Sequence, residues 1–125
     1  MKPKLLVIDD DPLITALYQR RFETVGFNVE VAADGAQGLA AVRRFNPDIV
    51  LLDLNMPNVT GVEWLRAIRD DPKFHQLPVV VFTAGVGSWQ ETSLRNSDVT
   101  YVLPKAGTKP QAVVDAVRAA ALGKH

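Results

Sequence analysis

The sequence predicts an α/β fold in which one doubly wound, five-stranded parallel sheet is covered by helices on both faces. Strand-like and helix-like segments alternate five times along the 125 residues, which is the pattern of such a sheet. Three of the expected strands are unbroken apolar runs, typical of strands buried on both faces: Leu5–Ile8, Ile49–Leu52 and Val79–Phe82. The length favours one domain with a hydrophobic core, so we expect a single domain over residues 1–125.

The first strand ends in three acids, Asp9, Asp10 and Asp11, and a helix is expected directly after them. Pro12 suits the first position of a helix because its φ angle is fixed and its missing N–H is not needed there. Asp11 is then the natural N-cap. Gly26 is expected to end this helix. Asp9 and Asp10 therefore need another explanation.

The other elements follow from the spacing of apolar residues and from the turn residues between them. Strands are expected over 27–31, at the sheet edge, and over 100–103, and helices over 35–45, 61–68, 89–96 and 108–121. Thr108 and Gln111 have capping-box spacing, so Thr108 is expected to cap the last helix. Residues 70–78 are expected to form a surface connection.

Composition and charge exclude several classes of protein. Fourteen acidic and fourteen basic residues give a formal charge of zero, which does not indicate a nucleic-acid surface. The sequence has no cysteine, which excludes disulfides, thiol catalysis and cysteine-ligated metals. The apolar runs are too short to span a bilayer, and the first residues lack the pattern of a signal peptide. We therefore expect a soluble cytoplasmic protein with no direct membrane partner.

Polar residues follow four of the expected strands: Asp9 and Asp10, Asp53, Thr83 and Lys105. The carboxyl ends of parallel strands lie at one edge of the sheet, where ligands bind in open α/β folds. Clustered carboxylates repel one another, and a hard divalent cation such as Mg²⁺ relieves this repulsion. A hydroxyl and an ammonium suit a phosphoryl group, and an aspartate can itself be the nucleophile. Each residue alone could be a cap, turn or loop residue, but their convergence favours a phosphoryl-transfer site.

This pattern resembles the receiver domain of a two-component response regulator, over nearly the whole chain from Leu5 to about Leu122. The positions that carry the resemblance are the acid pair Asp9 and Asp10, the segment Asp53–Pro57, Gly61, Thr83 with Ala84, and Lys105. The resemblance implies a flavodoxin-like strand order of 2-1-3-4-5 and five helices. That order comes from the resemblance and not from the residue pattern.

The resemblance also implies a phosphoacceptor and a metal site. Asp53 is the expected phosphoacceptor, which takes a phosphoryl group from the phosphohistidine of a sensor histidine kinase or phosphotransfer protein. The expected ligands of Mg²⁺ (or Mn²⁺) are Asp9, Asp10, Asp53 and the backbone carbonyl of Asn55. Such a protein assists its own phosphorylation and dephosphorylation but is not expected to be an enzyme.

Further roles follow from the same resemblance. Thr83 and Lys105 are expected to contact the phosphoryl oxygens, and the side chains of residues 55 and 85 occupy positions that tune hydrolysis of the phosphate. Gly85 has no side chain to offer there. The signal is expected to leave through a change in the surface formed by the fourth strand, the helix after it, the fifth strand and the last helix. A downstream protein is the expected partner, without direct nucleic-acid binding.

The sequence departs from the family pattern near the fifth strand. Ala106 stands where a proline, commonly joined by a cis bond, usually follows Lys105, so we expect a strained bond or a re-routed loop. The aromatic switch residue normally lies three positions before the lysine, where this chain has Val102, and Tyr101 is one place early. With regular strand register Val102 occupies the switch position, whereas a one-residue bulge near Pro104 or Ala106 would give that role to Tyr101. We favour the regular register, and expect Thr83 and Trp89 with its glycine-rich loop to carry the output.

Two other functions remain as alternatives. The first acids also match the D-x-D motif of haloacid-dehalogenase-type phosphatases, but Leu13 stands where that motif prefers Thr or Val, and the chain is short for that fold. The second alternative is a receiver-like interaction module that phosphorylation does not regulate. Trp64 is expected to be a packing residue, and His75 is assigned no function.

Overall fold

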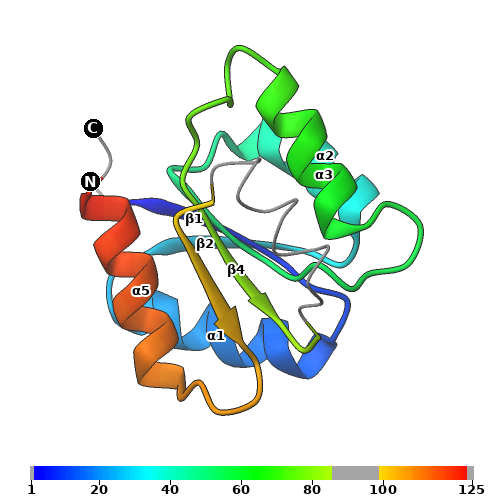
Figure 1. Cartoon of the computed structure of the whole chain (residues 1–125). Helices are drawn as coiled ribbons and strands as arrows, with labels where there is room; N and C mark the ends of the chain where they lie inside the picture. The colour runs from blue at the N-terminus through cyan, green and yellow to red at the C-terminus, as the bar shows by residue number, and fades with distance from the viewer. Residues whose placement is uncertain (1, 86–98, 124–125) are drawn as a thin grey trace.

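The computed structural model describes residues 2–85 and 99–123. Five parallel strands form one sheet in the order β2-β1-β3-β4-β5 (Figure 1). The strands are β1 (Lys4–Ile8), β2 (Asn28–Ala32), β3 (Ile49–Leu52), β4 (Val79–Thr83) and β5 (Tyr101–Pro104). The predicted fold class, and the strand order that the resemblance implied, are both confirmed.

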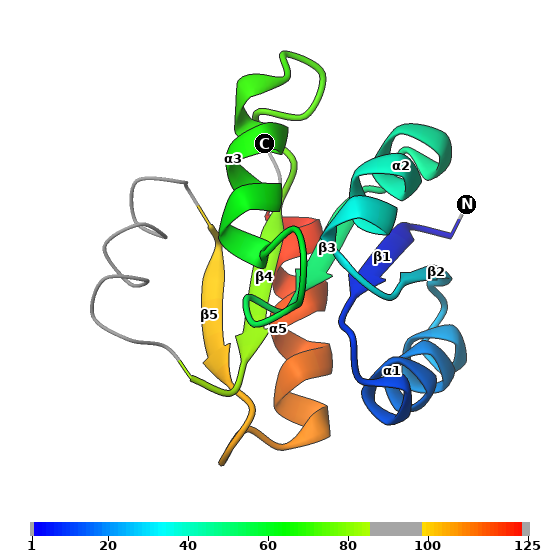
Figure 2. The same ribbon diagram turned by 90° about the vertical axis from the view of Figure 1, so that its right-hand side faces the viewer.

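Within the described residues, four helices cover the two faces of the sheet: α1 (Pro12–Thr24), α2 (Gly35–Phe45), α3 (Gly61–Asp70) and α5 (Pro110–Leu122). Figures 1 and 2 show α1 and α5 on one face and α2 and α3 on the other. The helix expected over 89–96 lies outside the described residues, so a fifth helix stays a prediction. In the described ranges, none of the helices has the length and apolar character needed to cross a membrane.

The first residues of two helices test the capping predictions. Asp11 caps α1 as predicted, because its carboxylate accepts a hydrogen bond from the backbone N–H of Leu13 at 2.9 Å. The prediction for Thr108 is wrong: α5 begins at Pro110, with Lys109 as N-cap and no side-chain cap hydrogen bond. A proline disfavours helical backbone at the residue before it, so Lys109 is extended and Thr108 lies outside the helix.

The helix α3 begins with a capping box that the sequence analysis did not single out. Thr60 accepts a hydrogen bond from the backbone N–H of Glu63 at 3.2 Å, and the Glu63 carboxylate accepts one from the Thr60 N–H at 2.9 Å. Two backbone N–H groups without helical partners are thereby satisfied. This cap fixes where the chain turns from the segment after β3 into α3.

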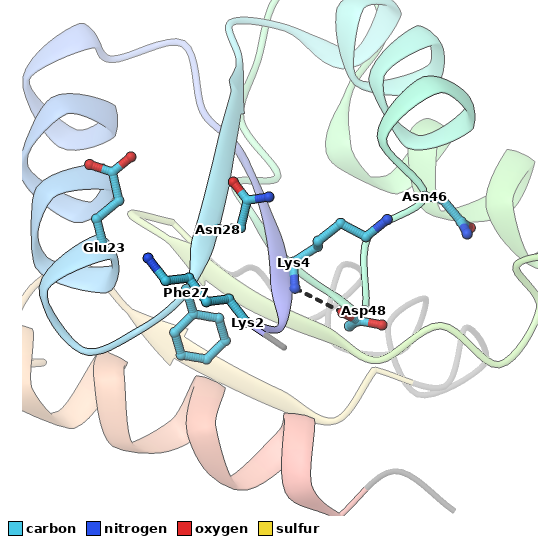
Figure 3. Close-up of a pocket in the computed structure, with 7 residues that line it drawn as sticks. All are labelled: Lys2, Lys4, Glu23, Phe27, Asn28, Asn46 and Asp48. Atoms are coloured by element: carbon cyan, nitrogen blue, oxygen red, sulfur yellow. Dashed lines mark hydrogen bonds between the residues drawn. The ribbon is translucent and has the colours of Figure 1, made fainter.

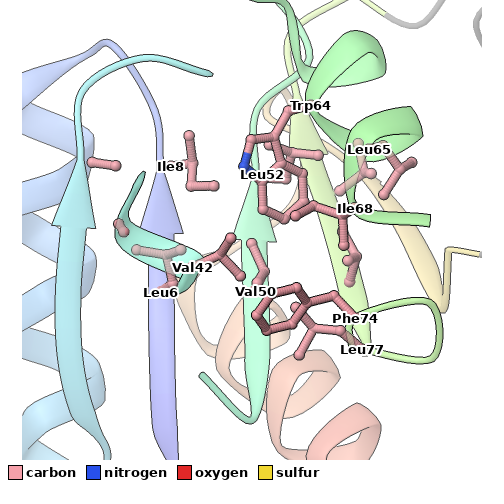
Figure 4. Close-up of a cluster of buried hydrophobic side chains, with 14 of the residues drawn as sticks. Leu6, Ile8, Val42, Val50, Leu52, Trp64, Leu65, Ile68, Phe74 and Leu77 are labelled. Atoms are coloured by element: carbon pink, nitrogen blue, oxygen red, sulfur yellow. The ribbon is translucent and has the colours of Figure 1, made fainter. Parts of the chain in front are cut away.

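The sheet separates two hydrophobic clusters, one on each face. Figure 4 shows the cluster beneath α2 and α3, in which Trp64 is fully buried, as expected for a packing residue. The segment over 70–78 is not only a surface connection, because Phe74 and Leu77 are 3% and 8% exposed and belong to this cluster. Arg69 holds that segment by donating hydrogen bonds to the carbonyls of Phe74, His75 and Leu77.

Candidate functional site

The expected site residues lie at the carboxyl ends of the strands, at one edge of the sheet. Backbone hydrogen bonds continue the parallel ladder by one residue beyond the strands. The Asp53 N–H donates to the carbonyl of Ile8 at 2.9 Å, and the Lys105 N–H donates to the carbonyl of Thr83 at 2.9 Å. The sheet itself therefore fixes where these side chains begin.

Lys105 joins two of the carboxylates. Its Nζ lies 2.8 Å from Oδ2 of Asp9 and 3.4 Å from Oδ2 of Asp53. Burial alone would lower the pKa of Lys105, but its hydrogen bond to Asp9 and the charges of Asp9 and Asp53 raise that pKa above its ordinary value. The side chain is therefore a fixed cation beside the candidate phosphoacceptor.

Three carboxylates meet at this edge, those of Asp9, Asp10 and Asp53. One oxygen from each lies within 4.8 Å of the others; Asp9 and Asp53 are buried and Asp10 is exposed. Burial raises the pKa of the Asp9 carboxyl, because a charged carboxylate is costly to bury. The hydrogen bonds that Asp9 accepts from Lys105 and from the Asp11 N–H partly offset this rise in pKa. Three carboxylates against one ammonium leave an excess of negative charge, and an all-oxygen donor set of this kind fits a hard divalent cation.

Asn55 contacts the site at two points. Its backbone N–H donates to Oδ1 of Asp53 at 3.2 Å, and its side-chain Nδ2 donates to Oγ1 of Thr83 at 3.1 Å. Thr83 is fully buried at the end of β4. The structure thus ties the candidate phosphoacceptor and the hydroxyl to one residue, a link between side chains 28 positions apart that the sequence did not reveal.

Gly61 was expected to begin a helix and is one of the positions that carry the resemblance, but the sequence did not reveal how closely it approaches the site. Its N–H donates to the carbonyl of Leu54 at 3.1 Å. A Cβ atom added at Gly61 would lie 2.4 Å from the carbonyl oxygen of Asp53 and 2.6 Å from Cα of Leu54. Only a glycine lets α3 approach the segment after β3 this closely.

With this geometry established, comparisons with known proteins identify the family. The chain matches the response regulator receiver domain over residues 5–118. It belongs to this family. The DNA-binding response regulator MtrA of Mycolicibacterium smegmatis is 39% identical over 84 residues, which make up 67% of this chain and 36% of MtrA. The chain spans about a third of the length of the curated relatives it matches.

Solved receiver structures superpose on most of the chain. The chemotaxis response regulator CheY4 of Vibrio cholerae is 25% identical with a TM-score of 0.87, covering 94% of this chain and 98% of CheY4. The phosphorylated cyanobacterial phytochrome response regulator RcpA is 26% identical with a TM-score of 0.81, covering 94% of this chain and 91% of RcpA. The chain is therefore a two-component receiver domain in both sequence and fold.

The loop after Lys105 differs from the receiver pattern at Ala106. Within the described ranges every peptide bond is trans, including the bond between these two residues. The chain turns at residues 105–107, and Gly107 has a φ of 88°, a left-handed backbone that suits glycine. Of the two expectations for this loop, the strained cis bond is therefore wrong.

The register of β5 decides which residue shares a face with Thr83. Val102 pairs with Val81 and Tyr101 with Val80, without a bulge. Because side chains alternate along a strand, Val102 lies on the same face of the sheet as Thr83, and Tyr101 lies on the α1/α5 face. Both are partly exposed, at 42% for Tyr101 and 39% for Val102. Trp89, the other expected switch residue, lies outside the described residues.

The opposite edge of the sheet carries an open pocket of about 820 Å³ (Figure 3). Its charged lining residues include Lys2, Lys4, Glu23 and Asp48, at or near the amino ends of the strands. The Lys4 backbone N–H donates to Asp48 at 2.8 Å, and Lys4 Nζ donates to the carbonyl of Phe45 at 2.9 Å. These contacts stabilise the fold, and the pocket lies far from the carboxylate cluster along the strands.

Proposed function

We propose that this receiver domain accepts a phosphoryl group on Asp53 in the presence of Mg²⁺. The observation that carries the proposal is the arrangement around Asp53: a carboxylate 3.4 Å from the Lys105 ammonium and within one oxygen cluster with Asp9 and Asp10. A nucleophilic carboxylate, a fixed cation and a hard-metal donor set are the parts that phosphoryl transfer requires. The phosphorylated state of the related RcpA supports the proposal.

In the proposed reaction, an oxygen of the Asp53 carboxylate attacks the phosphorus atom of a phosphohistidine. The new O–P bond forms as the P–N bond breaks, and the electron pair returns to the imidazole. Lys105 neutralises charge on one phosphoryl oxygen, and the Thr83 hydroxyl donates to another. Bound Mg²⁺, held by Asp9, Asp10, Asp53 and the Asn55 carbonyl, would supply further charge neutralisation.

Incubation with acetyl phosphate distinguishes this function from the two alternatives. We expect one phosphoryl group per chain. Labelling should be lost when a chelator removes Mg²⁺, because without the cation the three carboxylates repel the negatively charged phosphoryl group. Repeated turnover of a phosphomonoester substrate would instead support a phosphatase. Absence of any label, with Mg²⁺ present and the protein folded, would support an interaction module that phosphorylation does not regulate.

Mg²⁺ binding should depend on Asp10 more than on Asp11. Asp10 belongs to the oxygen cluster, whereas the side chain of Asp11 is occupied as the cap of α1. We expect Asp10→Ala to weaken Mg²⁺ binding strongly in a metal titration, and Asp11→Ala to lower the free energy of unfolding by about 1 kcal/mol. A larger loss of Mg²⁺ affinity in Asp11→Ala than in Asp10→Ala would contradict this division.

We further propose that a sensor histidine kinase or phosphotransfer protein supplies the phosphoryl group and that a downstream protein reads it. Receiver domains act between such partners, and a formal charge of zero does not indicate a nucleic-acid surface. MtrA is named as DNA-binding, but only 36% of its length is matched here. DNA binding in a relative therefore does not assign a DNA contact to these residues.

The switch should not depend on Tyr101, because the register of β5 places it on the face of the sheet opposite Thr83. We expect Tyr101→Ala to leave the beryllofluoride-induced change in the amide spectrum largely intact. Val102→Ala is the comparison, since Val102 shares the face of Thr83. Loss of the spectral change in Tyr101→Ala, while Asp53 is still labelled, would show that the tyrosine is the switch.

A further inference from the structure

We propose that Asn55 is a positioning residue that orients the Thr83 hydroxyl toward the phosphoryl group on Asp53. This inference rests on the proposed function of Asp53. It starts from the hydrogen bond between Asn55 Nδ2 and Thr83 Oγ1, at 3.1 Å, and from the bond between the Asn55 N–H and Asp53 Oδ1, at 3.2 Å. One residue thereby holds both groups that must contact the same phosphoryl group.

The donor and acceptor roles define the orientation of the hydroxyl. A threonine hydroxyl has one proton to donate and lone pairs to accept with. Since Oγ1 of Thr83 accepts from Asn55, its proton points away from that amide and remains available to a phosphoryl oxygen. A hydroxyl that accepts one hydrogen bond also donates more strongly, and the branched threonine side chain has few rotamers to lose. Asn55 therefore prepares Thr83 as a donor before the phosphoryl group arrives.

Because residue 85 is a glycine, it offers no side-chain acceptor that could compete with Thr83 for the Asn55 amide. A Cβ atom added at Gly85 would have Asn55 Nδ2 as its nearest neighbour, at 3.9 Å, which is ordinary van der Waals contact. An alanine therefore fits beside the amide, whereas a side chain carrying an acceptor oxygen at this position would reach the amide and compete with Thr83. The absence of a side chain at residue 85 thus leaves the Asn55 amide to the hydroxyl.

A double-mutant cycle on beryllofluoride affinity tests the inference. Asn55→Leu keeps a similar shape but removes the donor, and we expect about fivefold weaker binding of beryllofluoride in saturating Mg²⁺, the usual effect of one neutral hydrogen bond. Because Asn55 acts through Thr83, adding Asn55→Leu to Thr83→Val should change the affinity by less than about twofold. An equal loss in both backgrounds, or no loss in Asn55→Leu alone, would overturn the inference.

Two variants at Gly85 test the same contact without altering Asn55. Gly85→Asn supplies a neutral acceptor and should weaken beryllofluoride binding as Asn55→Leu does, whereas Gly85→Ala adds a side chain without an acceptor and should weaken that binding much less. Equal affinities of these two variants would contradict the competition for the amide. Failure of the wild-type protein to bind beryllofluoride at all would instead reject the proposed function, so the two failures are distinguishable.

Discussion

Replacing Lys105 with alanine should slow the labelling of Asp53 by acetyl phosphate by about 10²- to 10³-fold. The ammonium lies 3.4 Å from Asp53 Oδ2 and 2.8 Å from Asp9 Oδ2, so it is already in place where charge develops on the transferred group. Loss of one such preorganised electrostatic contact typically costs this much in rate. Intact-protein mass measured against time gives the rate directly.

A second lysine provides the matched control for this measurement. Lys109 precedes α5 and is exposed, so Lys109→Ala makes the same change in net charge without touching the carboxylates. We expect its labelling rate to match that of the wild type. Equal slowing in both variants would show that overall charge, and not the placement of Lys105, governs the reaction.

Replacing Gly61 with alanine should destabilise the fold by about 2–3 kcal/mol and impair labelling of Asp53. The added Cβ would lie 2.4 Å from the Asp53 carbonyl oxygen, and backbone atoms cannot move aside as the end of a flexible side chain can. Overpacking of this kind typically costs 1–3 kcal/mol. The segment after β3 must then shift, which moves the Asp53 carboxylate relative to Lys105. Urea unfolding measures the first effect and acetyl phosphate labelling the second.

This prediction opposes the expectation from helix propensity. Gly61 is the first residue of α3, and propensity alone would favour alanine over glycine in a helix by up to about 1 kcal/mol. Gly85→Ala serves as the control, since a Cβ there makes only ordinary contact. A stabilised Gly61→Ala protein with normal labelling would show that the close approach between α3 and Asp53 is not needed.

The sequence predicted the layout of the fold because its strong signals are local. The apolar runs that form β1, β3 and β4 are unbroken, and Asp11 followed by Pro12 is a direct capping signal. The residues that follow each strand necessarily meet at one edge of a parallel sheet, so the cluster of Asp9, Asp53 and Lys105 was predictable in outline. The sheet order, in contrast, came from the resemblance to the family.

The features that were missed depend on contacts between distant segments. The Asn55–Thr83 hydrogen bond and the close approach of Gly61 to Asp53 follow from how loops pack, which no local spacing encodes. Phe74 and Leu77 belong to the segment 70–78, which was expected to be a surface connection, but their side chains fill the cluster under α3. The error at Thr108 arose because the capping-box spacing was weighed without the restriction that the following proline places on Lys109.

The measurement that tests the central claim most directly is the intact mass of wild-type and Asp53→Asn proteins after exposure to acetyl phosphate and Mg²⁺. Asp53 directly follows β3, its carboxylate contacts Lys105, and one of its oxygens belongs to the cluster formed with Asp9 and Asp10. We predict the mass of one added phosphoryl group on the wild type and none on Asp53→Asn, with both proteins folded. Equal incorporation in the two proteins would contradict the assignment of Asp53 as the phosphoacceptor.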